Sequence, residues 1–210
     1  MRDKPDHTSI KLYDRETEEA RYPQLKKEFG KNKKLPRGYG LQALVALSHY
    51  PELKDIAIEF IYKETDATAY CRPVFSTMIM PSRERTYRVV ISKKIRKSKE
   101  AVRFHNLSFS AQIGVIGHEL GHISYFIGKS AMEMAEIGLK YIGDNDFKRK
   151  LEIGTDLIAI EHGFGNQLIE YARLVEEQQV KFPEDEYYLT YFMFYMTPAE
   201  ILKAMNKLQN

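Results

Sequence analysis

The segment IGVIGHELGHI, residues 113–123, decides how this chain is expected to fold. In a helix, His118 and His122 lie four residues apart, so their imidazoles project from one face, one turn apart. The apolar residues of the segment and its continuation fall on the opposite face, where they can anchor the helix in a core: Ile116, Leu120, Ile123 and Ile127. The segment therefore predicts a core helix that presents two imidazoles to a cleft.

The spacing of the two histidines is suited to a metal ion. Two imidazoles at positions i and i+4 of a helix can bind a single zinc ion. Glu119 lies about 100° around the helix from His118. It is therefore close enough to reach a zinc-bound water but poorly placed to be a third ligand, and this is the position of a general base.

A third metal ligand is expected elsewhere, because a catalytic zinc ion usually has three protein ligands and one open position. Glu152 and Asp156 are again four residues apart, after a turn at residues 143–146 that lets a second helix fold back. We expect Glu152 to bind one zinc ion per chain. We expect Asp156 to accept a hydrogen bond from a zinc histidine and so fix its tautomer. The alternatives are a core histidine pair and a structural zinc site, but structural sites often use several cysteines and this chain has one.

Three glycines form a second stripe on the same helix, beside the histidine face: Gly114, Gly117 and Gly121. A glycine in a helix interior costs up to about 1 kcal/mol relative to alanine. Its repeated use predicts that another backbone approaches this face closely.

The remaining periodicity gives the fold class. Residues 41–47 are expected to form a buried helix, and the chain from residue 110 onward is expected to be helical. In residues 56–62 and 86–92 apolar and polar residues alternate, which predicts strands, and another strand is expected around residues 76–80. We therefore expect an α+β fold, with a small, mostly antiparallel sheet on the active-site helix and a helical C-terminal half. Residues 1–40 are expected to be a polar, extended arm with one short helix, and residues 41–210 a single domain.

Basic residues flank the expected strand at 86–92 on both sides, which is typical of an edge strand. Such charges commonly discourage aggregation. The alternative is that Val89, Val90 and Ile91 hold an extended peptide by strand addition.

Two motifs together resemble a known group of enzymes. His-Glu-Leu-Gly-His at 118–122 followed by Glu-x-x-x-Asp at 152–156 resembles the gluzincin metallopeptidases. Residues 160–168, IEHGFGNQL, are similar to the segment after the zinc glutamate in the CaaX-prenyl-protease and heat-shock-type membrane metallopeptidases. The resemblance covers roughly residues 85–175 and is to their soluble core, without their membrane helices.

The resemblance implies a zincin-like fold and a zinc-dependent peptidase. In such an enzyme a metal-activated water attacks the peptide bond, and Glu119 would be the general base. A peptide or protein substrate would lie extended along residues 89–91. A rival interpretation is a non-catalytic zinc-binding domain for peptide recognition or regulation, which would need the same ligands.

The residue that stabilises the oxyanion cannot be placed from the sequence. Such a group is needed because negative charge develops on the carbonyl oxygen. His162, six residues after Asp156, either lines the cleft or caps and packs its helix. Four tyrosines lie at a spacing that more often indicates core packing, and the alternative is that one of them reaches the zinc: Tyr187, Tyr188, Tyr191 and Tyr195.

Composition excludes other partners and leaves the location open. The formal net charge of +3 is spread along the chain, and the basic runs at residues 31–34 and 93–99 are short, so no nucleic-acid partner is expected. No apolar run reaches the length of a membrane helix, so no membrane span is expected. We expect a cytoplasmic protein if Met1 is the natural start, and an exported one if a leader has been removed.

Overall fold

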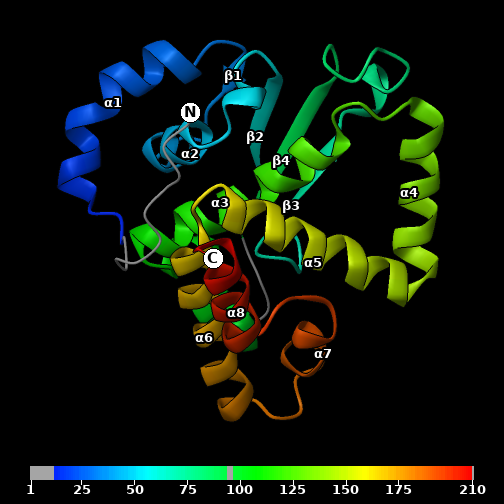
Figure 1. Cartoon of the computed structure of the whole chain (residues 1–210). Helices are drawn as coiled ribbons and strands as arrows, with labels where there is room; N and C mark the ends of the chain where they lie inside the picture. The colour runs from blue at the N-terminus through cyan, green and yellow to red at the C-terminus, as the bar shows by residue number, and fades with distance from the viewer. Residues whose placement is uncertain (1–11, 94–96, 210) are drawn as a thin grey trace.

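The computed structural model describes residues 12–93 and 97–209, and within them helices predominate (Figure 1). The first eleven residues of the expected arm, and residues 94–96 of the basic run, lie outside the described residues. The helices are α1 (Arg15–Phe29), α2 (Gly40–Ser48), α3 (Phe109–Phe126), α4 (Ala131–Gly143), α5 (Asn145–Glu161), α6 (Gly165–Lys181), α7 (Glu186–Phe194) and α8 (Pro198–Gln209). The strands are β1 (Lys33–Lys34), β2 (Ala57–Lys63), β3 (Ala69–Pro73) and β4 (Thr86–Ser92).

The sheet is mixed, with the strand order β1-β2-β4-β3. Strand β2 runs parallel to both β1 and β4, and β3 runs antiparallel to β4. The expected α+β class is therefore confirmed, whereas the expectation of a mostly antiparallel sheet is wrong. The strand expected around residues 76–80 lies earlier, at β3, and is followed by the short 3-10 helix η2 (Phe75–Thr77).

Strand β4 is a central strand, so the expected edge position of Val89, Val90 and Ile91 is wrong. Val89 is in register with Phe60 of β2 on one side and with Cys71 of β3 on the other. Backbone groups that already pair with two neighbouring strands cannot add a peptide. Of the basic residues near β4, Arg85 has another role, because it is 2% exposed and donates to the carbonyl oxygens of Met80 and Lys129.

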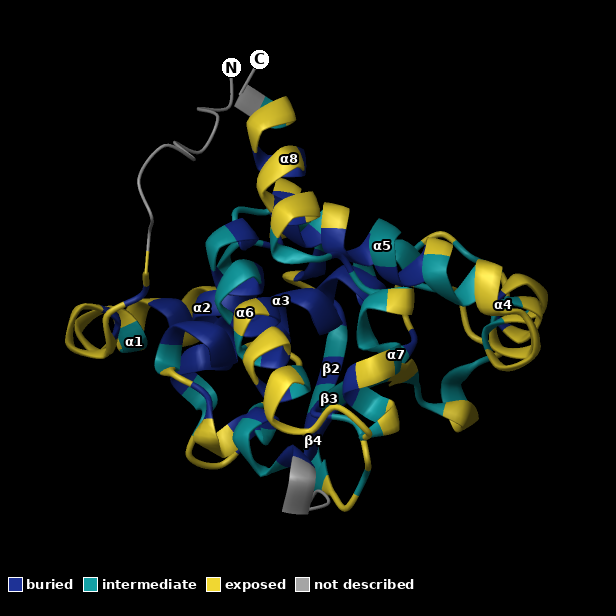
Figure 2. Ribbon diagram, turned by 90° about the horizontal axis from the view of Figure 1, so that it is seen from below, coloured by how far each residue is buried: buried dark blue, intermediate teal, exposed yellow. Residues whose placement is uncertain are grey.

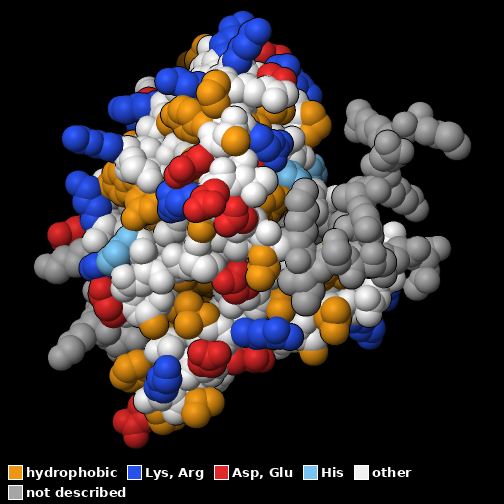
Figure 3. All heavy atoms as spheres, turned by 90° about the vertical axis from the view of Figure 1, so that its left-hand side faces the viewer, with side chains coloured by type: hydrophobic (Ala, Val, Ile, Leu, Met, Phe, Trp, Pro, Cys, Tyr) orange, Lys and Arg blue, Asp and Glu red, His pale blue; other side chains and the backbone are white. Residues whose placement is uncertain are grey.

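The described part of the expected arm contains the expected helix, which is the 15-residue α1, and strand β1, which pairs with β2. Helix α1 begins after Asp14, whose carboxylate accepts a hydrogen bond from the Thr17 amide at 2.9 Å. It packs against α2 and buries Leu25. On the side of the molecule that carries α1, acidic and basic side chains are interspersed with apolar ones (Figure 3).

Helix α3 lies at the centre of the fold, packed against α2, α5 and α6 and against β3. Its ribbon is buried along most of its length (Figure 2). A Cβ atom on Gly114 would lie 3.0 Å from the backbone carbon of Gln167, and one on Gly121 would lie 3.2 Å from the carbonyl oxygen of Thr155. The close backbone approach that the glycine stripe predicted is thus present, and it brings α6 and α5 onto α3.

The chain after residue 108 is almost entirely helical, as expected. The turn expected at residues 143–146 separates α4 from α5, and the last helix begins with a reciprocal cap between Thr197 and Glu200. None of the helices in the described ranges is long and apolar enough to cross a membrane.

Candidate metal centre

Three side chains converge between α3 and α5. His118 and His122 project from α3, Glu152 projects from α5, and one ligand atom from each lies within 4.8 Å of the others. The Glu152 Oε2 atom is 3.2 Å from His118 Nε2 and 3.3 Å from His122 Nε2. Ligand atoms around a tetrahedral zinc ion with bonds of about 2.0–2.1 Å would be about 3.3 Å apart. This group, which we call the metal cluster, can therefore hold a metal ion.

The outer nitrogens of both imidazoles are held by neighbouring residues of α5. His118 Nδ1 lies 2.9 Å from Asp156 Oδ1, whose other oxygen accepts a hydrogen bond from the Met196 amide at 3.1 Å. His122 Nδ1 lies 3.1 Å from the hydroxyl oxygen of Thr155, and that hydroxyl donates to the Leu151 carbonyl at 2.9 Å. Because the Thr155 hydroxyl donates elsewhere, its oxygen accepts from His122.

These hydrogen bonds fix the tautomers that a metal site needs. When both Nδ1 atoms carry the proton, both Nε2 lone pairs face Glu152 and are available to a metal ion. The contact between Asp156 and His118 is the one expected from the sequence. The contact between Thr155 and His122 was not anticipated, although Thr155 lies directly before Asp156 on the same helix.

The electrostatics of the metal cluster favour bound positive charge. Burial by itself would lower the pKa of His118, but its hydrogen bonds to Asp156 and Glu152 raise that pKa well above its ordinary value. Burial would likewise raise the pKa of Glu152, yet the two histidines hold it well below its usual range. Protons or a divalent cation can both supply that charge.

Tyr141 of α4 binds the second oxygen of Glu152. Its hydroxyl donates to Glu152 Oε1 at 2.5 Å, which leaves Oε2 facing the two histidines. Burial and the nearby Glu152 charge raise the pKa of Tyr141, so the phenol remains a donor. The sequence could not predict this contact. Tyr141 and Glu152 lie on different helices, so the helical period does not relate their positions.

Glu119 stands beside the metal cluster with one oxygen unsatisfied. The side chain is buried, and none of the described residues makes a hydrogen bond to its Oε2 atom. Burial raises the pKa of Glu119, while the positive charge of the two histidines opposes that change. A buried polar atom without a protein partner usually binds water or a ligand.

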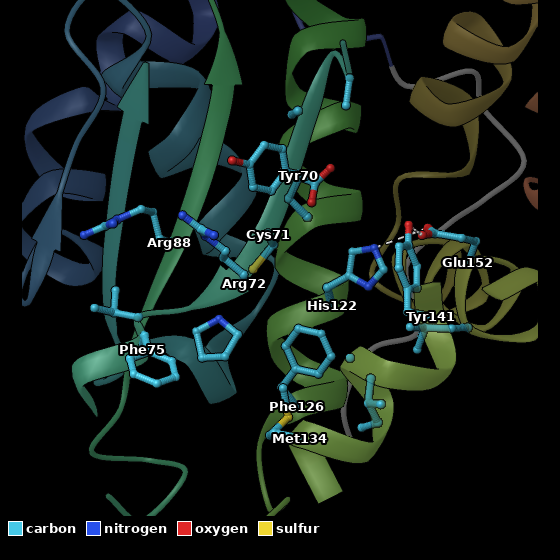
Figure 4. A pocket seen from close by; sticks show the side chains of 18 of the residues that line it. Tyr70, Cys71, Arg72, Phe75, Arg88, His122, Phe126, Met134, Tyr141 and Glu152 are labelled. Carbon is cyan, nitrogen blue, oxygen red and sulfur yellow. Dashed lines mark hydrogen bonds and ion pairs between the residues drawn. The ribbon is translucent and has the colours of Figure 1, made fainter. Parts of the chain in front are cut away.

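The metal cluster and Glu119 line a cavity of about 850 Å³. Figure 4 shows its walls, with Arg72 and Phe75 on the strand side, Phe126 and Met134 on the helical side, and Tyr141 beside Glu152. The edge strand β3 supplies residues 69–73 to the lining. A smaller cavity of about 80 Å³ also borders His118 and Glu119, and three of the four C-terminal tyrosines line it: Tyr187, Tyr191 and Tyr195.

The other residues expected in the cleft lie elsewhere. Val89, Val90 and Ile91 are in the central strand, where they contribute to the sheet and not to the cavity lining. His162 is the C-cap of α5, stacks on Tyr50 with ring centroids 4.0 Å apart, and points at Glu52. His162 therefore has the capping and packing role, and the prediction that it lines the cleft is wrong.

The donor set limits the chemistry that this centre can support. Two imidazole nitrogens and one carboxylate oxygen are fewer protein ligands than a closed structural site uses. A site of this kind keeps a position open, here toward a large cavity that also contains Glu119. Comparisons with family models, with curated proteins and with solved structures found no match to this chain.

Proposed function

We propose that this protein is a zinc-dependent peptidase in which His118, His122 and Glu152 hold the metal. Bound zinc would supply Lewis-acid activation of a water molecule and of a peptide carbonyl. The observation that carries the proposal is Glu119 Oε2, a buried oxygen with no partner among the described residues, on the residue next to His118 and in the same cavity. That is where a general base is needed.

Glu119 has the freedom that this role requires. A carboxylate that is not held by other side chains can take a proton from the attacking water and return it to the leaving amine. Asp156 and Thr155 perform a different task, since each holds the outer nitrogen of one histidine. Their hydrogen bonds keep both inner nitrogens directed at the metal position.

The position of strand β3 is suited to binding a peptide substrate. It ends the sheet formed by the described residues, and Ala69–Pro73 borders the cavity. An extended peptide can add to such an edge through main-chain hydrogen bonds and place one of its carbonyls near the metal cluster. The peptide position proposed from the sequence therefore moves from residues 89–91 to β3.

The substitution Glu119→Gln tests the proposal. By elemental analysis, the purified wild type and the variant should each contain about one zinc ion per chain, because the substitution leaves the three ligands unchanged. Cleavage of a mixture of synthetic peptides, followed by mass spectrometry, should fall by about 10²–10⁴-fold, the usual contribution of a general base.

Glu170→Gln is the matched control. Glu170 also has one buried oxygen without a partner, but it lies on α6, accepts a hydrogen bond from Ser108 and does not line the cavity. Its variant should cleave like the wild type. Wild-type rates in zinc-loaded Glu119→Gln would refute the proposal. Zinc binding without any cleavage by the wild type would favour the non-catalytic peptide-recognition domain.

A further inference from the structure

Helix α4 contributes to both the cavity and the metal cluster through one face. Met134, Ile137, Gly138 and Tyr141 follow the i, i+3, i+4, i+7 pattern and all line the cavity. Tyr141 also donates to Glu152. Whatever binds against this face of α4 therefore contacts the helix that positions a metal ligand.

Away from the metal cluster, the cavity wall is mainly apolar. Phe75 and Met78 lie on the strand side, Phe126 comes from α3, and Ile142 lies near the end of α4. Phe75 is 91% exposed and Ile142 is 87% exposed, so the mouth of the cavity presents apolar side chains to solvent. A cavity of about 850 Å³ is within the range of ordinary ligand sites. Its chemistry suits a large aliphatic or aromatic group.

The attachment of α4 to the body of the protein is limited. Within the described residues, α4 packs closely only against α5, and Met134 is its one buried side chain. An apolar group in the cavity would add contacts along the inner face of α4. Those contacts would favour the position of α4 in which Tyr141 reaches Glu152.

We propose that a large apolar side chain of a peptide binds against α4 in this cavity, and that its binding and metal binding strengthen each other through Tyr141 and Glu152. The identity of the ligand as a peptide rests on the proposed peptidase function. The coupling itself needs no turnover. It is reciprocal, because a ligand that stabilises the metal-binding arrangement must in turn be bound more tightly when metal is present.

The test measures zinc affinity by chelator competition in Glu119→Gln, with and without a peptide. The probe is the blocked dipeptide acetyl-Phe-Leu-amide, and acetyl-Gly-Gly-amide is the control that lacks apolar side chains. We expect saturating acetyl-Phe-Leu-amide to tighten zinc binding by about fivefold or more, the lower end of typical coupling between two sites. The glycine peptide should leave zinc affinity unchanged.

Two glycines provide a matched pair of variants in the same background. A Cβ atom on Gly138 of α4, or on Gly154 of α5, would meet no heavy atom within 4 Å, but only Gly138 lines the cavity. Gly138→Leu should therefore abolish the effect of the apolar peptide while zinc still binds. Gly154→Leu should retain both zinc binding and the peptide effect.

Tyr141→Phe tests the connection between the two sites. Loss of a hydrogen bond to a metal ligand typically lowers metal affinity by about 10–100-fold. We expect that loss here, together with a smaller peptide effect. Tyr87→Phe is the control, because it removes a hydroxyl that donates to the Ser82 carbonyl, away from the metal cluster.

The outcomes separate this inference from the proposed function. Equal zinc affinity with and without acetyl-Phe-Leu-amide would overturn the inference, as would identical behaviour of Gly138→Leu and Gly154→Leu. Wild-type zinc affinity and an undiminished peptide effect in Tyr141→Phe would overturn the role of Tyr141. Failure of the peptidase proposal would appear instead in the cleavage assay, as rates that do not depend on Glu119.

Discussion

Helix α5 takes part in two histidine–carboxylate clusters. In the metal cluster its Glu152 meets His118 and His122. In the second, which we call the cap cluster, His162 at the C-terminal end of α5 meets Glu52 of the short 3-10 helix η1 (Pro51–Leu53) at 3.1 Å. The residue types are the same, but only the first cluster has the geometry of a metal site.

The difference lies in convergence and burial. In the metal cluster one carboxylate oxygen faces two imidazole nitrogens, and Glu152 is 1% exposed. In the cap cluster a single imidazole uses both nitrogens for structure, since Nδ1 donates to the Ile158 carbonyl and Nε2 faces Glu52. The Glu52 side chain is 31% exposed. A histidine near a carboxylate is therefore not enough for a metal site, whereas the convergence of three buried ligand atoms gives a group that could hold a metal ion.

The largest expected effect comes from removing the shared carboxylate. Glu152→Gln should weaken zinc binding by more than the roughly 10–100-fold that loss of an outer partner causes, because it neutralises a ligand itself. Chelator competition measures the change. Glu52→Gln makes the same substitution in the cap cluster and should leave zinc affinity unchanged. Equal losses in the two variants would remove the distinction between the clusters.

Asp156→Asn should lower zinc affinity by about 10–100-fold. The Met196 amide needs an acceptor, so the asparagine oxygen is expected to face it and the side-chain NH₂ to face His118 Nδ1. That arrangement favours the tautomer whose proton is on Nε2, where the metal should bind. Nitrogen NMR of the metal-free protein would report the tautomer, and an unchanged tautomer would contradict this explanation.

Thr155→Val should have a smaller effect, about tenfold on zinc affinity. Valine keeps the methyl group that packs on Gly121 but removes the oxygen that accepts from His122. Thr190→Val is the matched control, because Thr190 also donates to the carbonyl four residues earlier but is only half-buried and lies on α7, away from both histidines. A comparable loss of zinc affinity in both variants would mean that the effect is not specific to His122.

The smallest effect is expected in the cap cluster. Burial by itself would lower the pKa of His162, but its hydrogen bonds to Glu52 and to the Ile158 carbonyl raise that pKa above 6.5. Burial would raise the pKa of Glu52, but hydrogen bonds from His162 and Ser124 lower it below 4.5. Both side chains are charged between pH 4.5 and pH 6.5. Because the ion pair is partly exposed, it contributes about 1 kcal/mol to the free energy of unfolding.

Its contribution to stability has a defined pH dependence. Stability from His162 is fully present below pH 6.5 and is lost as pH rises through the raised pKa. Stability from Glu52 is lost as pH falls through its lowered pKa. Denaturant unfolding of wild type and His162→Gln should therefore differ most near pH 6 and converge at high pH. A difference that grows above pH 7 would contradict the ion pair.

The metal cluster could be predicted because its signals are local. His118 with His122, and Glu152 with Asp156, are each separated by one helical turn, and the helix period alone places each pair on one face. The glycine stripe on α3 indicated that other helices would approach closely, which they do. Helical periodicity was therefore enough to predict α3 and α5, the three residues of the metal cluster and the carboxylate that holds His118.

The sheet and the cavity could not be predicted in the same way. Strand order depends on pairing between segments far apart in the chain, and β4 became central because β3 pairs with its outer side. Basic residues near β4 suggested an edge, yet Arg85 is a buried cation that joins two loops. Tyr141 reaches Glu152 only because α4 and α5 fold against each other, and no local pattern encodes that contact.

The methionines in and near the segments that line the cavity can be oxidised. Met78 and Met134 line the cavity, while Met80 and Met132, on the same two segments, are 38% and 82% exposed. Oxidation converts the apolar thioether to a polar sulfoxide, and exposure governs which residue reacts first. Peroxide should therefore modify Met132 well before Met134, which is 5% exposed. Oxidation would therefore reach the cavity-lining Met134 only after the exposed Met132, and methionine sulfoxide reductases would reverse both changes.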